Sequence, residues 1–285
     1  MNVVFYASDK TYDRAISRAM AKGARCTGFK VEVRPTEQFA GPDPAVDLTF
    51  VVGVKANSGP ILDAYAKAGK HGAIFDKGYT RIAGGELGTL YWRLSVNGHQ
   101  PLDYFQKMGR PPDRWEALNK PIKTDRPDGQ IVLFAGSSQK FCDVHGLGDA
   151  NDYAAQVMTK AAKYTGKTIV YRPKPSWGKG RQIEGFGFSP PKAKFDLELA
   201  RTHCLVTYGS NACFEALLSG VPAIVLGNGI TRPICDTTLK RLEHPRVPSG
   251  DEVYRLACDV AYCQWTLDEM YSGLVWADVR KILER

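Results

Sequence analysis

The densest group of residues able to bind a ligand follows an apolar stretch in the second half of the chain, where residues 206–217 read VTYGSNACFEAL. Gly209 permits close approach of the backbone, and Ser210 or Asn211 can cap a following helix. Free N–H groups at a helix start attract anions, so this spacing predicts a site for a diphosphate. Glu215 lies about one helical turn later, where its carboxylate can accept hydrogen bonds from ribose hydroxyls. The alternative interpretation is an ordinary strand–helix unit with a capped helix.

Two more loops carry groups suited to a phosphate, each directly after an expected strand. Residues 136–140 read GSSQK after the strand at 130–135, and residues 172–175 read RPKP at the end of the strand at 168–172. An arginine can hold a phosphate with two hydrogen bonds, whereas a lysine supplies a point charge. A solvated loop and a rigid loop exit are the respective alternatives. The predicted nucleotide site comprises Gly136, Ser137, Ser138, Lys140, Arg172, Lys174, Tyr208, Gly209, Ser210, Asn211 and Glu215.

Apolar stretches that alternate with helical segments predict the elements that position these loops. In the first half we expect strands at 3–7, 29–33, 47–54 and 72–76, helices at 12–22 and 59–69, and a more exposed strand at 91–97. Gly23 is expected to stop the first helix. The second half repeats the pattern, with strands at 130–135, 168–172, 204–208 and 222–226 and helices at 150–165, 197–202 and 212–219. Such alternation predicts an α/β fold of two Rossmann-like domains, each with a parallel sheet.

The domain boundaries are expected where the pattern loosens. A segment at 109–128 is rich in proline and charge and is typical of an interdomain linker. We therefore expect an N-terminal domain at residues 1–125, a C-terminal domain at 126–262 and a final helical segment at 263–285. Gln264 and Trp265 in that last segment are expected to have a structural role.

Residues 206–222 resemble the donor-binding motif of GT-B glycosyltransferases, in which a strand is followed by Gly-Ser-Asn, then Glu-Ala-Leu, then Gly-Val-Pro. Within that class the chain looks similar to phage-encoded transferases that add sugars to hydroxymethylated DNA bases. Capsule Kdo transferases share the stretch more loosely. The resemblance implies an N-terminal domain that binds the acceptor and a C-terminal domain that binds a UDP-sugar, with UDP-glucose as the expected donor. It also implies a last helix that crosses back to brace the N-terminal domain.

The same resemblance favours an inverting, metal-independent transfer. Retaining enzymes of the commonest sort carry a second glutamate, whose position falls here at Ala223, and the sequence has no Asp-x-Asp metal motif. An inverting enzyme needs a general base near the acceptor oxygen, expected at the carboxyl end of a strand in the first half. Asp76 is the preferred base, and His99 and Asp103 are alternatives. Each has a plainer interpretation, as a turn cap, a surface histidine or a charge at a helix start.

Aromatic and cationic residues around the expected base suit an acceptor polymer. Arg81, Trp92 and Arg93 are followed by the more distant Lys107 and Arg110. Such a mixture suits a DNA backbone with a flipped base, and it suits packing between domains nearly as well. The predicted acceptor site comprises Lys77, Tyr79, Arg81, Trp92 and Arg93.

The composition limits the class of protein. The 285 residues are 44% hydrophobic, enough for a sizeable core, and the net charge of +8 favours a polyanionic partner such as DNA or an anionic polysaccharide. Seven scattered cysteines show no disulfide or metal pattern, which favours a reducing compartment. With no apolar run of membrane length and no secretory leader, we expect a monomer in the cytoplasm, that of the host if the protein is phage-encoded.

Other function classes stay open at this point. Within enzymes, the runner-up is a transferase that builds capsule or cell-surface polysaccharide. Outside enzymes, it is a non-catalytic protein that binds nucleic acid or a nucleotide-sugar. A dinucleotide-dependent oxidoreductase is disfavoured because residues 7–10 read ASDK where a Gly-x-Gly-x-x-Gly turn would stand. Asp143 and His145 are interpreted as loop residues because no complete set of metal ligands accompanies them.

Overall fold

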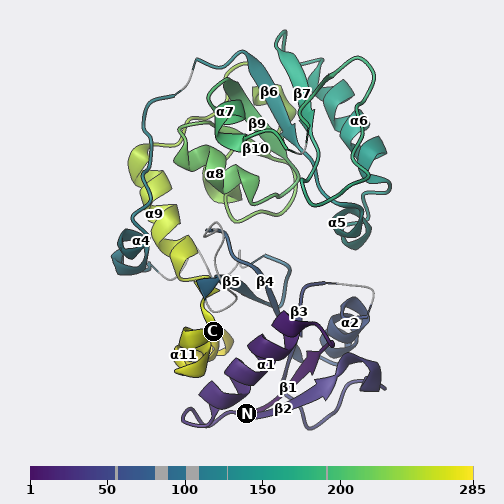
Figure 1. The fold of residues 1–285 in the computed structure, drawn as a ribbon, viewed down its shortest axis with the longest axis vertical. Coiled ribbons are helices and arrows are strands. Elements are labelled where there is room, and N and C mark those ends of the chain that lie inside the picture. Colours follow the sequence, from purple (N-terminus) through teal and green to yellow (C-terminus); the bar gives the residue numbers. More distant parts are fainter. Residues whose placement is uncertain (55–56, 81–88, 101–108, 127, 191, 285) are drawn as a thin grey trace. The chain divides into compact units, whose positions relative to one another are not determined.

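The computed structural model describes residues 1–54, 57–80, 89–100, 109–126, 128–190 and 192–284. Its chain divides into two compact units, each shown in Figure 1. Unit 1 consists of residues 1–110 together with 259–285, and unit 2 consists of residues 111–258. These divisions fall some residues before the boundaries expected from the sequence, at 110/111 and 258/259 instead of 125/126 and 262/263.

Unit 1 is built on a six-stranded sheet in the order β11-β5-β4-β3-β1-β2. The strands are β1 (Asn2–Ala7), β2 (Lys30–Pro35), β3 (Leu48–Val52), β4 (His71–Lys77), β5 (Trp92–Val96) and β11 (Gln264–Trp265). Strands β1 to β4 are parallel, whereas β5 runs antiparallel to both β4 and β11. The central strands β1 and β3 are apolar along most of their length and buried, as expected of parallel strands covered on both faces.

The C-terminal segment of the chain contributes α10 (Leu267–Tyr271) and α11 (Leu274–Leu283) to unit 1. In the ranges that the structure describes, the other helices of this unit are α1 (Thr11–Ala24), the short 3-10 helix η1 (Thr36–Gln38) and α2 (Gly59–Lys67). Helix α10 packs on α1, and the Trp276 indole donates a hydrogen bond to the Met20 carbonyl at 2.9 Å. The last part of the chain therefore returns to the N-terminal sheet, which confirms the predicted crossover.

Gly23 has a role in packing and does not end the first helix as expected. Helix α1 continues past it to Ala24, so it does not stop the helix. A Cβ at Gly23 would overlap the Met270 carbonyl oxygen. The glycine is needed because α10 lies against α1 at that point.

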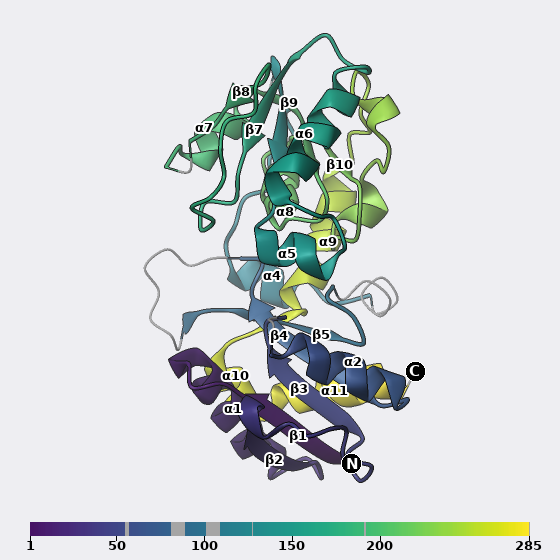
Figure 2. The ribbon, with the colours of Figure 1, turned by 90° about the vertical axis from the view of Figure 1, so that its right-hand side faces the viewer.

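Unit 2 holds a five-stranded sheet in the order β10-β9-β6-β7-β8, and all of its pairs are parallel. The strands are β6 (Ile131–Ala135), β7 (Thr168–Arg172), β8 (Gly187–Phe188), β9 (Thr202–Thr207) and β10 (Ala223–Val225). The helices are α4 (Asp113–Ala117), α5 (Gln139–Val144), α6 (Ala150–Ala161), α7 (Phe195–Leu199), α8 (Ala212–Leu218) and α9 (Gly250–Ala261), with 3-10 helices η3 (Arg232–Ile234) and η4 (Leu239–Arg241). Figure 2 shows α6 and β7 from a second side.

Two segments, β5 and residues 109–128, contain buried side chains that the sequence does not predict. The strand predicted to be exposed, β5, is buried at every residue because β4 and β11 flank it and the Trp92 ring stacks on Tyr12. The segment predicted as a linker contains α4, whose Trp115 is buried against Phe214 of unit 2. In both cases tertiary packing covers residues whose local sequence is typical of a surface.

Candidate functional site

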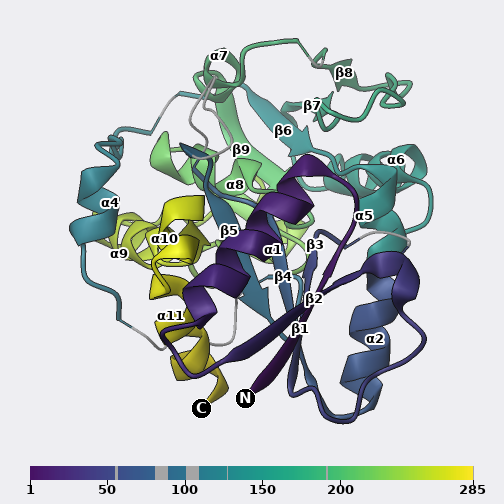
Figure 3. The same ribbon diagram turned by 60° about the horizontal axis from the view of Figure 1, so that its bottom comes forward.

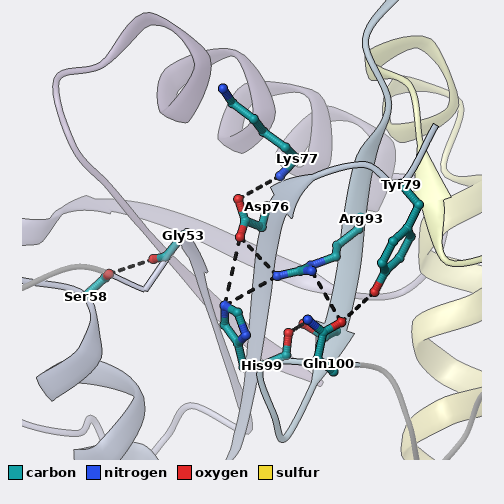
Figure 4. Close-up of polar contacts among 9 residues, drawn as sticks. Gly53, Ser58, Asp76, Lys77, Tyr79, Arg93, His99 and Gln100 are labelled. Carbon is teal, nitrogen blue, oxygen red and sulfur yellow. Dashed lines mark hydrogen bonds and ion pairs between the residues drawn. The ribbon is translucent and has the colours of Figure 1, made fainter. Parts of the chain in front are cut away.

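Asp76 lies near the end of β4 and is held by its neighbour across the sheet, Arg93 of β5. Arg93 Nη2 is 3.0 Å from Asp76 Oδ2, and the Lys77 amide donates to Oδ1 at 2.8 Å (Figure 4). The arginine side chain is only 3% exposed, whereas the aspartate side chain is 38% exposed. A buried cation therefore orients a carboxylate that still reaches solvent, by a charge-assisted hydrogen bond.

His99 completes the group of polar side chains around Asp76. Its Nε2 lies 4.0 Å from Asp76 Oδ2 and 3.4 Å from Arg93 Nη2, and its side chain is 18% exposed. The Gln100 side-chain oxygen accepts from the Tyr79 hydroxyl at 2.8 Å and from Arg93 Nη1 at 3.3 Å. We call these five residues the Asp76 cluster (Figure 4). The structure thus brings together two of the three predicted bases, while Asp103 lies outside the described residues.

Most of the predicted acceptor contacts have a supporting position instead. Tyr79, Trp92 and Arg93 are between 2% and 4% exposed. Trp92 stacks on Tyr12 of α1, and the Arg93 guanidinium lies over the Tyr79 ring. Burial raises the pKa of the Tyr79 hydroxyl well above its ordinary value, so it stays protonated and donates to Gln100. Lys77 is exposed, and its side chain points away from the cluster in Figure 4. Arg81 lies outside the described residues.

A residue from the far end of the chain holds the turn after β4. The Gln264 side-chain oxygen accepts from the Tyr79 amide at 2.8 Å and from the Thr80 amide at 3.0 Å, and its nitrogen donates to Thr80 Oγ1. Gln264 is fully buried. No local pattern points to this contact, since 184 residues separate Gln264 from Thr80.

In unit 2 the predicted nucleotide loops meet at one edge of the sheet. The loop at 136–138 follows β6 and the loop at 208–211 follows β9, and these strands are parallel neighbours. From β6 the chain continues to β7 on one side, whereas from β9 it continues to β10 on the other. The carboxyl ends of such strands form the topological switch point, where α/β sheets bind their ligands. We call these two segments the switch-point loops.

The glycines of the switch-point loops are required by close packing. A Cβ at Gly209 would overlap the Asn228 carbonyl oxygen, and one at Gly136 would lie 2.6 Å from the Tyr171 ring. The Ser210 amide donates to Thr207 Oγ1 at 3.1 Å. These contacts hold the backbone of both loops close to the sheet edge.

The start of α8 follows one of the two predicted capping schemes. The Ser210 hydroxyl accepts from the Ala212 amide at 3.3 Å, whereas Asn211 stands at the cap position without a side-chain bond to the first turn. Asn211 and Glu215 are four residues apart and share one face of the helix. Glu215, Lys140 and Lys174 are exposed and thus accessible to a ligand, and Ser137 and Ser138 are partly exposed.

Arg172 does not have the position expected of a phosphate ligand. Its guanidinium donates to Ser189 Oγ at 2.8 Å and to the Ala193 carbonyl at 2.9 Å, and it lies 3.8 Å from the Glu198 carboxylate. The residue is 7% exposed. Since these partners use its charge and donors internally, Arg172 stabilises the segment after β8. Of the three predicted cations, only Lys140 and Lys174 are exposed.

Aromatic side chains gather around Tyr208 beside the switch-point loops. They include His145, which the sequence analysis interprets as a loop residue. The Tyr208 ring lies 5.2 Å from His145, 5.8 Å from Phe141 and 6.1 Å from Tyr153, centroid to centroid. Burial lowers the pKa of His145, so its ring is neutral near pH 7. The described residues contain no group of three His, Cys, Asp or Glu side chains that could hold a metal ion. Nor does any helix in the described ranges have the length and apolar character to cross a membrane.

Solved structures with a similar arrangement include two Kdo transferases and a UDP-GlcNAc 2-epimerase. The beta Kdo 2,4 transferase of Thermosulfurimonas dismutans KpsC is 14% identical, with 91% of this chain and 90% of that chain covered and a TM-score of 0.54. The beta Kdo 2,7 transferase of the same KpsC is 12% identical, with 96% and 99% covered and a TM-score of 0.49. The UDP-GlcNAc 2-epimerase of Methanocaldococcus jannaschii is 10% identical, with 99% and 100% covered and a TM-score of 0.34. No protein-family model and no curated protein matches the sequence.

Identities this low show a shared fold and nothing finer. Both units of the chain have a sheet of mainly parallel strands with helices between them, and the C-terminal segment belongs to the first unit. This chain therefore has the two-domain, Rossmann-like GT-B fold.

Proposed function

We propose that this protein is a glycosyltransferase that moves a hexose from a UDP-sugar to a hydroxyl group, with inversion at the anomeric carbon. The observation that carries the proposal is the Asp76 carboxylate, which is exposed to solvent and oriented by the buried Arg93. A fold shared with a Kdo transferase supports glycosyl transfer as the chemistry. UDP-glucose is the donor that we propose to test first.

Unit 2 is proposed to bind the donor at the switch-point loops. The backbone of residues 208–211 and 136–138 would approach the diphosphate, and the exposed Lys140 and Lys174 would balance its charge. Glu215 would accept hydrogen bonds from the ribose hydroxyls. Because cations and backbone N–H groups meet the phosphate charge, this scheme uses no metal ion.

Unit 1 is proposed to supply the general base. Asp76 accepts the proton of the acceptor hydroxyl while that oxygen forms a bond to the anomeric carbon of the sugar. The bond from the anomeric carbon to the diphosphate oxygen breaks, and UDP leaves with the electron pair. Arg93 acts as a positioning residue, since its guanidinium orients the carboxylate by a charge-assisted hydrogen bond while its own side chain is only 3% exposed.

The base is tested by following UDP release for Asp76→Asn, with Asp63→Asn, an exposed aspartate of the same unit, as the matched control. We expect a loss of about 10²- to 10⁴-fold for Asp76→Asn with UDP binding retained, and no loss for Asp63→Asn. Unchanged turnover would contradict the assignment. Loss of UDP binding as well as turnover would contradict the division of roles between the units.

His99 is the alternative base, and the pH profile separates the two. An imidazole loses its proton at a higher pH than a carboxylate does, so the limb in which the rate rises with pH lies at higher pH if the base is His99 than if it is Asp76. With Asp76 as the base, His99→Gln should lower the rate modestly and leave the position of the limb unchanged. A limb near neutral pH that disappears in His99→Gln would assign the base to His99.

For the acceptor we propose a hydroxymethylated pyrimidine base in DNA. The net charge of +8 and the resemblance of residues 206–222 to phage DNA-base transferases support this choice. A second candidate is a cell-surface polysaccharide, which is favoured by the fold shared with the Kdo transferase. UDP release measured with hydroxymethyl-pyrimidine DNA, unmodified DNA and an acidic oligosaccharide decides between them. Release with the oligosaccharide alone would overturn the DNA assignment, and binding without any release would favour a non-catalytic protein.

A further inference from the structure

A groove in unit 1 lies apart from the Asp76 cluster and is lined by cations. It runs between α1 and the edge strand β2 and has a volume of ≈ 760 Å³. Figure 3 shows α1 alongside β1 and β2. Among the described residues that line it are five cationic side chains, against one carboxylate, Asp9. The cations are Arg14, Arg18, Lys22, Arg25 and Arg34.

The spacing of the cations along α1, with Arg25 at its C-cap, places four of them on one face. Arg14, Arg18, Lys22 and Arg25 follow one another at steps of four, four and three residues, and all four are exposed. The opposite face of the helix is apolar, with Ile16, Ala19 and Met20 in the core. Positions separated by three or four residues lie above one another on a helix, so the four charges form a line along the groove.

Most carboxylates near the groove already have a partner. Asp13 is buried and accepts from the Ser8 hydroxyl, and Glu32 and Asp43 both pair with Arg34. In the part of the chain that the structure describes, the four cations of α1 form no ion pair. Even with Arg34 neutralised by these carboxylates, the four cations of α1 and its C-cap outnumber Asp9, so the groove presents a net positive charge.

We propose that this groove binds the phosphodiester backbone of DNA. The line from Arg14 to Arg25 is about 16 Å long at the rise of an α-helix. The phosphates of a DNA strand follow one another at a rise of about 3.4 Å along the duplex axis, so neighbouring cations of the line can contact different phosphates. The proposal rests on the proposed function only in naming DNA as the nucleic acid.

The chemistry of the lining favours phosphates over an anionic polysaccharide. Three of the four cations on α1 are arginines, whose planar fork suits phosphate oxygens. A polysaccharide would also present many hydroxyl groups, which amide and carboxylate side chains recognise, yet the described lining offers only Asp9 for this purpose. Tyr271 adds a ring that is 39% exposed, with the Lys22 ammonium 5.2 Å from its centre, and such rings can stack on a base.

The test is the salt dependence of DNA binding, measured by fluorescence anisotropy with a labelled, unmodified duplex and no sugar donor. The groove variant is Arg14→Gln/Arg18→Gln/Lys22→Gln, and the matched control removes three exposed lysines of unit 2, Lys160→Gln/Lys163→Gln/Lys192→Gln. Both lose the same net charge. We expect the groove variant to bind at least tenfold more weakly at low salt and to lose about two to three from the slope of log K against log salt. The control should change the slope by less than one.

Several outcomes would overturn the proposal. Equal losses in the groove and control variants would mean that net charge acts alone, and an unchanged slope in the groove variant would remove the groove from DNA binding. A carboxylated polysaccharide and unlabelled DNA are compared as competitors at equal concentrations of negative charge. If the polysaccharide displaces the labelled duplex at the lower concentration, the groove is assigned to a polysaccharide. UDP release, measured separately with a single hydroxymethyl nucleoside, tests the proposed function without the groove.

Discussion

Replacing Gln264 by leucine tests how the C-terminal segment supports the turn beside Asp76. Leucine has a similar volume but lacks the amide, so the change removes the three hydrogen bonds that Gln264 forms with Tyr79 and Thr80 and leaves the packing nearly intact. The Tyr79 and Thr80 backbone N–H groups and Thr80 Oγ1 lose their partner. Because Tyr79 is 2% and Thr80 5% exposed, water cannot replace the lost bonds without opening the turn.

The expected cost follows from the number of donors left unsatisfied. A buried donor without a partner costs about 1–3 kcal/mol, so two backbone N–H groups cost about 2–6 kcal/mol. The turn has little room to rearrange, since a Cβ at Gly78 would lie 2.7 Å from Tyr91 and 2.9 Å from the Gln264 oxygen itself. A domain is stable by only about 5–15 kcal/mol, so the change removes a large share of the stability of unit 1.

Two measurements check this cost. Urea unfolding of the full chain reports the loss of free energy, and amide hydrogen exchange at Tyr79 and Thr80 reports whether the turn opens locally. Gln130→Leu, at an exposed glutamine of unit 2, is the matched control and should stay within about 0.5 kcal/mol of the wild type. The rate of transfer should fall as well, because the turn follows β4 and its Asp76 directly.

One result would refute the reasoning. If Gln264→Leu unfolds within about 0.5 kcal/mol of the wild type and both amides stay protected, the Gln264 contacts do not hold the turn. A matching loss in Gln130→Leu would point instead to a general effect of added apolar surface.

Two further changes test unit 2. Gly209→Ala should destabilise unit 2 by about 1–3 kcal/mol and weaken UDP binding, because the alanine Cβ would overlap the Asn228 carbonyl. Gly178→Ala is the matched control, since the space around Gly178 is open, and it should change neither stability nor UDP binding. Equal melting temperatures for the two variants would contradict the prediction. Burial lowers the pKa of His145 in the folded state, so on acidification the unfolded state takes up a proton before the folded state does. The stability that comes from the neutral ring is therefore present above about pH 6.5, the ordinary pKa of histidine, and is lost as the pH falls below that value. His145→Gln should therefore make the free energy of unfolding depend less on pH between about pH 7 and pH 5. His244→Gln, at an exposed site, is the control and should leave this dependence unchanged. An unchanged dependence in His145→Gln would contradict the prediction.

Local sequence was sufficient for the fold class and for the switch-point loops. A buried strand, a glycine and a helix start are adjacent in the chain, so the position of Gly209 and Ser210 at a strand end follows from residues within a few positions of them. The alternation of such units then implied parallel sheets. Asp76 was placed at a strand end by the same reasoning, and β4 does reach Lys77.

Roles that depend on distant partners could not be read from the sequence. Arg172 has the residue type and position of a phosphate ligand, yet Ser189, Ala193 and Glu198 use its guanidinium inside unit 2. Arg93 was expected to contact an acceptor, and the antiparallel pairing of β4 and β5 sets it opposite Asp76 instead.

The sequence by itself determined which residues end strands and begin helices, because those preferences act over a few neighbouring residues. Only the tertiary structure decided which of these side chains reach solvent and which support others. Gln264 illustrates the difference, since its partner Thr80 is 184 residues away and becomes adjacent only when β11 joins the sheet beside β5. Burial and pairing depend on the whole packed chain, and a charged side chain of the same type can therefore bind a ligand in one place and hold the fold in another.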